Sequence, residues 1–157
     1  MERTLVIFKP DAVHRHLVGR ILARLEDKGL RVAALKLQWL PRPLVERHYE
    51  VHQRKPFYAA LVDFMASGPV VLAVLEGPDA IAVVRNLAGA THGRDAAPGT
   101  IRGDFGLDQQ LNLVHASDGP ETARKEIEVF FRPEEIVSYE RATERWITGK
   151  LRVTNSE

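Results

Sequence analysis

No cysteine occurs among the 157 residues, and this absence excludes disulfide bonds, thiolate catalysis and cysteine-based zinc sites. It is also typical of chains that work in the reducing interior of a cell. Long apolar runs are missing too. TLVIF at 4–8, near the N-terminus, is far too short for a signal peptide, and no window approaches a membrane span. We therefore expect a cytoplasmic protein without a membrane segment.

An excess of charge of one sign is also absent, because 22 basic residues stand against 21 acidic ones. No overall field attracts nucleic acid or an anionic membrane, so any anion site has to be local. The content of 45% hydrophobic and 27% charged residues is typical of a globular protein. A chain of this length can bury its own core, and we expect one domain over 1–157.

Several sequence signatures of nucleotide, metal and RNA binding are missing. Neither G-x-x-x-x-G-K-[ST] nor G-x-G-x-x-G occurs, which excludes a P-loop and a Rossmann site. H-E-x-x-H is absent, and no strand-like segment carries the K/R-G-F-G-F-V-x-F pattern of an RNA-recognition module. We therefore expect no dedicated nucleic-acid site.

The apolar pattern that is present alternates strands with helices. Continuous apolar runs predict buried strands at 4–8 and 69–77, and the apolar Leu113 and Val114 favour another at 111–114. The alternation of LKLQW at 35–39 predicts a strand with one wet face. Helical spacing of apolar residues predicts helices within 18–25, 41–52, 55–68, 79–89 and 120–131.

This order of elements predicts an α/β sandwich, in which helices cover one face of a ferredoxin-like, four-stranded antiparallel sheet. Residues 89–110 show no periodicity, and so long a loop in a compact domain is usually functional or disordered. Its glycines and two arginines would suit a phosphate, but the composition equally allows an ordinary surface loop.

His115 stands between the last expected strand and the last expected helix, where a histidine could cap, pack, bind metal or act as a nucleophile. The segment around it, NLVHASD, resembles the N-x-x-H-G-S-D active-site signature of nucleoside diphosphate kinases. Three further segments resemble that family in the same order and at compatible spacing: ERTLVIFKPDAV, HYEVHQRKPFYAALVDFMASGPVV and GATHGRDAAPGTIRGDF. The resemblance covers roughly residues 2–147.

The resemblance implies a ping-pong transfer, in which a nucleoside triphosphate, typically ATP, phosphorylates a histidine that then phosphorylates a nucleoside diphosphate. It also implies Mg²⁺ held mainly through the nucleotide phosphates, with no metal ligands from the protein. His115 matches the nucleophile, Glu126 the carboxylate that holds its other ring nitrogen, and Ser117 a supporting hydroxyl. A neutral imidazole is a good nucleophile near pH 7, and a covalent intermediate divides one transfer into two.

The other matching residues are nucleotide ligands in the family. Phosphoryl transfer depends on positioning and charge, and the matching phosphate ligands are Lys9, Arg85, Arg102 and Thr91. Phe57 matches the aromatic residue on which the base stacks in the family, and Leu61 would extend that apolar surface. Stacking gives affinity with little base discrimination. The resemblance also assigns Tyr49 to a place beside the catalytic histidine, His52 to the α-phosphate and Asn112 to the sugar hydroxyl. Tyr49 and His52 are three residues apart, so we expect them on one helical face.

Three features depart from the family pattern. Ala116 stands where the family has a glycine. If that position requires a positive φ, the alanine costs about 1–2 kcal/mol of stability. T-H-G-R-D at 91–95 replaces T-N-P-x-x, and the tail at about 147–157 runs past the family's usual end.

The resemblance further implies a homo-oligomer, a hexamer first and a tetramer next, with 89–110 at subunit contacts. The large apolar residues of LKLQWL also favour assembly, because a lone domain would leave them uncovered. Two other classes stay open at this point. One is an inactive nucleotide-binding relative, and the other is a ferredoxin-like regulatory or nucleic-acid-binding module.

Overall fold

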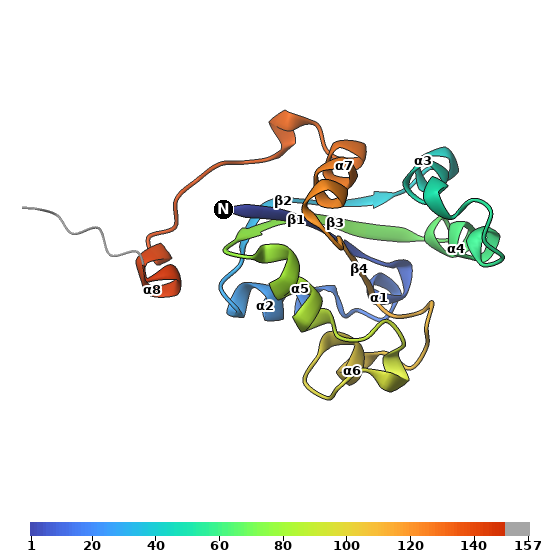
Figure 1. Ribbon diagram of the computed structural model, residues 1–157, viewed down its shortest axis with the longest axis horizontal. Coiled ribbons are helices and arrows are strands. Elements are labelled where there is room, and N and C mark those ends of the chain that lie inside the picture. The colour runs from blue at the N-terminus through green and yellow to red at the C-terminus, as the bar shows by residue number, and fades with distance from the viewer. Residues whose placement is uncertain (150–157) are drawn as a thin grey trace, which may run out of the picture.

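Four strands form one antiparallel sheet in the order β2-β3-β1-β4, in a computed structural model that describes residues 1–149 (Figure 1). Strand β1 pairs with both β3 and β4, so that Phe8 lies opposite Val71 and Ile7 opposite His115. This is the predicted ferredoxin-like arrangement. The strands are β1 (Glu2–Phe8), β2 (Arg31–Trp39), β3 (Pro69–Gly77) and β4 (Val114–Ala116).

Helices cover both faces of this sheet (Figure 1). One face carries α1 (Pro10–His14), α2 (Val18–Asp27) and α5 (Ala80–Ala88), and the other carries α3 (Arg42–His48), α4 (Tyr58–Met65) and α7 (Pro120–Phe130). Successive side chains of β1 enter two separate cores, Val6 and Phe8 on one side and Leu5 and Ile7 on the other. The expectation of helices over one face only is wrong. Continuous apolar runs such as TLVIF are typical of strands that are buried on both faces.

Strand β4 begins three residues later than the apolar pattern predicts. The expected strand at 111–114 is interrupted because Leu113 has a φ of +77°, and the ladder with β1 starts at Val114. His115 therefore lies inside the strand rather than after it. Ala116 also lies in the strand and is not at positive φ, so the alanine carries no left-handed backbone penalty.

The segment at 89–110 is not the structureless loop that the sequence suggests. It contains a 3₁₀ turn, η2 (Gly93–Asp95), and a short helix, α6 (Ile101–Phe105), whose N-cap Thr100 accepts the N–H of Gly103. An ion pair of 2.6 Å between Arg24 and Asp104 connects it to α2. Both elements are too short to produce a periodic apolar pattern.

The chain leaves α7 through η3 (Pro133–Glu135) and runs as an extended arm to α8 (Glu144–Thr148) (Figure 1). Arg141 attaches this arm to the body of the protein by donating to the carbonyl of Gly29 at 2.9 Å. Of the expected extension at about 147–157, residues 150–157 lie outside the described part of the chain. No helix within residues 1–149 is long and apolar enough to cross a membrane.

Candidate active site

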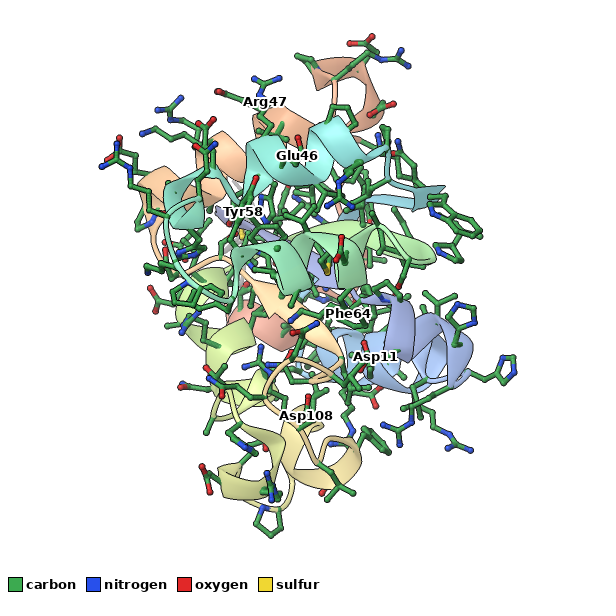
Figure 2. The ribbon with its side chains drawn as sticks, turned by 90° about the vertical axis from the view of Figure 1, so that its right-hand side faces the viewer. Asp11, Glu46, Arg47, Tyr58, Phe64 and Asp108 are labelled. Atoms are coloured by element: carbon green, nitrogen blue, oxygen red, sulfur yellow. The ribbon has the colours of Figure 1, made fainter. Side chains whose placement is uncertain are left out.

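A cleft of about 1150 Å³ opens at one end of the sheet, between α3 and α4 on one side and the segment before β4 on the other. Figure 2 looks at this end of the molecule, with Arg47 of α3 near the top and Asp108 below. Both of these residues line the cleft. So do all of the site residues suggested by the sequence except Ser117: Lys9, Tyr49, His52, Phe57, Leu61, Arg85, Thr91, Arg102, Asn112, His115 and Glu126.

The imidazole of His115 is held at one nitrogen only. Its Nε2 lies 2.5 Å from Oε2 of Glu126, which projects from α7. Its Nδ1 makes no hydrogen bond to residues 1–149, and its side chain is 23% exposed, on the cleft. If Nε2 carries the ring proton and donates it to Glu126, Nδ1 holds the lone pair that a nucleophile needs.

Glu126 is a buried carboxylate that stays ionised. Burial by itself would raise the pKa of Glu126, but the hydrogen bond and charge of His115 outweigh burial and hold this pKa below its usual value. Ser117 and His48 contribute in the same direction. The Ser117 hydroxyl is itself fully buried, and its Oγ accepts the backbone N–H of Leu5 in β1. Ser117 thus lies behind the site, where it supports the junction of β1 with the start of α7.

His48 is a site residue that the sequence reasoning missed. Its ring, at the end of α3, lies edge-on to that of His115, with centroids 4.9 Å apart and an interplanar angle of 88°. Its Nε2 is 3.6 Å from Oε2 of Glu126. Burial, followed by the neighbouring charge of His115, lowers the pKa of His48 to about 3, so this ring is neutral. His48 belongs to the HYEVH segment that also holds Tyr49 and His52, so the signal for it lay in that segment.

Tyr49 and His52 do not share one helical face, because α3 ends at His48 and the chain continues as η1 (Glu50–His52). Tyr49 turns into the core, with its ring 6.5 Å from that of His115, and burial raises its pKa. The His52 ring instead lies 5.5 Å from Phe57. The expected shared face is therefore wrong, although both residues reach the cleft.

Lys9, Asn112 and Thr91 form a connected polar group beside His115. Nζ of Lys9 donates to Oδ1 of Asn112 at 2.7 Å, and Nδ2 of Asn112 donates to the carbonyl of Thr91 at 2.8 Å. Burial lowers the pKa of Lys9 to about 8, with a further lowering by Arg102 and an opposing effect of Asp11. Asn112 is thus a buried amide, and both ends of its side chain have hydrogen-bond partners.

Arg102 and Arg85 bring two guanidinium groups to the same cleft. Arg102 donates to the carbonyls of Gly89, Asn112 and Val114, so it fixes the segment that precedes β4. Burial, and then the charge of Arg85, lower the pKa of Arg102 to about 10. Arg85, in the last turn of α5, contacts the carbonyl of Ala116 at 3.3 Å and is otherwise exposed.

Phe57 and Leu61 form an apolar wall at the outer end of the cleft. Phe57 is 48% exposed, and Nζ of Lys55 lies 5.7 Å from its ring centroid. Sequence reasoning missed three polar residues that also line the cleft, Asp108, Gln109 and Gln110.

Comparison with known proteins agrees with this geometry. The sequence model of the nucleoside diphosphate kinase family matches residues 2–136. This chain belongs to that family. Two similar relatives are the nucleoside diphosphate kinases of Archaeoglobus fulgidus, 57% identical over 94% of this chain and 97% of its own length, and of Pyrococcus horikoshii, 56% identical over 95% and 96%.

Solved structures of the nucleoside diphosphate kinase family also share the fold. The enzyme of Halobacterium salinarum in complex with CDP has a TM-score of 0.91 at 47% identity, covering 93% of this chain and 97% of its own. A family protein from Babesia bovis has a TM-score of 0.91 at 46% identity, covering 94% and 99%. The resemblance in the short sequence segments therefore extends to the whole fold.

Proposed function

We propose that this protein acts as a nucleoside diphosphate kinase, which moves the γ-phosphoryl group of a nucleoside triphosphate to a nucleoside diphosphate through a phosphohistidine on His115. The observation that carries the proposal is that the His115 imidazole is hydrogen-bonded at only one of its two nitrogens. Nε2 is fixed by Glu126 at 2.5 Å, and Nδ1 is left without a partner among residues 1–149 on a cleft lined by cations.

The chemistry follows from this tautomer. The Nδ1 lone pair attacks the γ-phosphorus, the new P–N bond forms, the bond to the bridging oxygen breaks, and the nucleoside diphosphate leaves with that oxygen. The ring gains positive charge in this step, and the Glu126 carboxylate offsets it. A terminal oxygen of the second nucleoside diphosphate then attacks the phosphohistidine and restores neutral His115.

Lys9, Arg85 and Arg102 are the groups that would neutralise the nucleotide phosphates, with the exposed hydroxyl of Thr91 as a further donor. A guanidinium has five N–H donors, so Arg102 can bind the three backbone carbonyls and still reach a phosphate. Cations already fixed in place add charge stabilisation without reorganising during the reaction.

At the nucleoside end, Phe57 and Leu61 would stack on the base, while Asn112 and Lys9 would bind the sugar hydroxyls. His52 would lie near the α-phosphate, and Tyr49 would pack beside the phosphorylated ring. Stacking uses a π-face that all bases share.

We propose that the divalent cation used by this family is Mg²⁺ in this protein, and that the nucleotide phosphates supply most of its ligands. Within residues 1–149, the group with the spacing of metal ligands contains two imidazoles, whereas Mg²⁺ prefers oxygen ligands and keeps several waters. The phosphates of a bound nucleotide supply such oxygens. Bound there, Mg²⁺ would neutralise part of the phosphate charge.

A closed homo-oligomer, with a hexamer before a tetramer, is part of the same proposal. Strand β2 lies at the sheet edge and exposes Leu35, Leu37 and Trp39 by 49%, 66% and 64%. Such an apolar edge favours pairing with a second chain. Light scattering over a dilution series tests this, and a monomer of 17.6 kDa at micromolar concentration would contradict it.

A coupled assay of phosphoryl transfer from ATP to a second nucleoside diphosphate tests the activity. Steady turnover with ping-pong kinetics is expected. Nucleotide binding without transfer would indicate an inactive relative. A protein that shows neither binding nor transfer would instead be a regulatory module of the same fold. A cytoplasmic location, also proposed, fits the absence of cysteine.

A further inference from the structure

His48, His115 and Glu126 bring three potential metal ligands together next to the candidate nucleophile. One ligand atom from each residue lies within 4.8 Å of the other two. The residues come from three different elements, α3, β4 and α7, so the cluster is a product of the fold and not of a local sequence motif.

Two atoms of this cluster have coordinating capacity that the protein does not use. Nε2 of His48 and Oε1 of Glu126 are both buried, and neither has a partner within 3.5 Å among residues 1–149, although the Ser117 hydroxyl is close enough to lower the pKa of Glu126. A buried polar atom without a partner is uncommon and calls for a ligand or a role. His48 has no part in the proposed transfer, and imidazole is a common metal ligand.

We propose that His48, His115 and Glu126 form an inhibitory site for a borderline transition-metal ion of the Zn²⁺ class. Two imidazoles and one carboxylate, completed by a water, are a ligand set that Zn²⁺ adopts in tetrahedral geometry. The proposed Mg²⁺ favours oxygen ligands instead, so the two ions would occupy separate places. Excess Mg²⁺ therefore would not relieve the inhibition.

The distances require a small movement of one ring. Ligand atoms on a tetrahedral Zn²⁺ with bonds of about 2.0–2.1 Å lie about 3.3 Å apart. Nε2 of His48 and Oε2 of Glu126 are near this separation, at 3.6 Å. Nε2 of His115 and Oε2 of Glu126 are only 2.5 Å apart and have to move away from one another. The His48 side chain is 4% exposed and fixed, but that of His115 is 23% exposed and can shift toward the cleft.

Coordination through Nε2 changes the tautomer of His115. The metal takes the Nε2 lone pair, so the single proton of the neutral ring moves to Nδ1, which then has no lone pair to attack phosphorus. In the phosphorylated ring, by contrast, Nδ1 carries the phosphoryl group and Nε2 the proton. Metal bound at Nε2 therefore blocks the attack of Nδ1 on phosphorus. This consequence rests on the proposed role of His115, whereas metal binding itself does not.

Calorimetric titration of the nucleotide-free full chain with Zn²⁺ tests the binding. We expect one ion per chain, and His48→Phe should weaken this binding at least about tenfold, because losing even a supporting residue of a metal site costs about 10–100-fold. The matched control is His16→Asn, which removes an exposed imidazole at a φ of +57° that asparagine tolerates. Equal Zn²⁺ affinity in His48→Phe and the wild type would overturn the site.

Co²⁺ gives a second readout that does not depend on activity, since its visible absorption distinguishes tetrahedral from octahedral coordination. The wild type should show the intense tetrahedral band, and His48→Gln should lose it. If His48→Phe does not fold, His48→Gln and Glu126→Gln serve in its place in the titration. An octahedral Co²⁺ spectrum in the wild type would contradict the proposed ligand set.

Labelling of His115 by ATP tests the inhibition. With excess Mg²⁺ present throughout, stoichiometric Zn²⁺ should suppress labelling in the wild type and a Zn²⁺-selective chelator should restore it. His48→Phe should be inhibited less relative to its own Zn²⁺-free rate. Sequestration of ATP by Zn²⁺ affects both proteins equally, so the difference reports the site. Tight binding that leaves labelling intact would overturn the inhibition. Absence of labelling with Mg²⁺ present and no Zn²⁺ added would instead contradict the proposed function.

Discussion

The carboxylate of Asp11 accepts the backbone N–H of Leu113 at 3.1 Å, at a position where the backbone is in the left-handed region with a φ of +77°. Such a conformation costs a non-glycine residue about 1–3 kcal/mol. The carbonyl of Leu113 accepts the N–H of Lys9 at 2.8 Å, so both polar groups of this buried peptide are satisfied. The resulting bend directs Asn112 toward Nζ of Lys9.

Replacing Asp11 by alanine should therefore destabilise the protein and disturb the site together. The buried N–H of Leu113 would lose its partner, which lowers the free energy of unfolding by about 1–3 kcal/mol. Urea denaturation measures this loss, and nucleotide affinity should fall in the same variant. Asp27→Ala, at an exposed position, serves as control and should stay within about 0.5 kcal/mol of the wild type. Equal stability of the Asp11 and Asp27 variants would contradict the role of this bond.

The lowered pKa of Lys9 predicts a pH dependence of nucleotide binding. Because the pKa of Lys9 is about 8, the free protein loses this ammonium charge as the pH rises through 8. Only the charged form neutralises a phosphate, so the affinity for ADP should fall about tenfold between pH 7 and pH 9. Calorimetry at several pH values measures the affinity. Lys9→Arg should bind with less dependence on pH, and a flat profile in the wild type would count against the charged role of Lys9.

Removing the charge of Glu126 should slow phosphorylation of His115. Glu126→Gln keeps the shape of the side chain but loses the charge that offsets the reacting imidazole, and we expect the rate to drop by about a hundredfold or more. Rapid-quench labelling with ATP measures the step directly. Glu121→Gln removes an exposed carboxylate from the first turn of the same helix, outside the cleft, and should react as the wild type does. Similar rates for the two variants would rule out the proposed role.

Base identity should matter little for the acceptor. Phe57 offers a stacking face that all bases share, so Phe57→Ala should raise KM for ADP, GDP, CDP and UDP alike, by about 10- to 100-fold. Steady-state kinetics with the four acceptors measures both effects. A wild-type preference above about a thousandfold, some 4 kcal/mol, would require strong base-edge hydrogen bonds, for which Gln109 and Gln110 are the nearest candidates.

The strands and the long helices could be predicted from the sequence because their apolar patterns are strong. The strand at 69–77 was placed correctly, and so was the helix that begins at Pro120. The start of β4 was misplaced because the bend at Leu113 depends on Asp11, about a hundred residues away, and no local pattern encodes such a contact. The second layer of helices was missed although the continuous apolar runs contained that information.

The site was predictable only through its resemblance to a known family. Spacing alone left His115 open to several roles, whereas the fold brings Lys9, Glu126 and Asn112 to it from distant segments. His48 was missed because its importance lies in a ring contact with His115 across two elements. The large apolar residues of LKLQWL were all expected to be uncovered, but Leu40 is 2% exposed while its neighbour Trp39 is 64% exposed. Only the fold distinguishes these two residues.

Phosphorylation of His115 by ATP in the absence of any acceptor tests the central claim most directly. Mass spectrometry of the briefly incubated protein should find one acid-labile phosphoryl group on His115, attached at Nδ1 because Glu126 holds Nε2. His16→Asn should label normally, and His115→Asn should neither label nor turn over. Labelling and turnover that persist in His115→Asn would show that the phosphoryl group travels by another route.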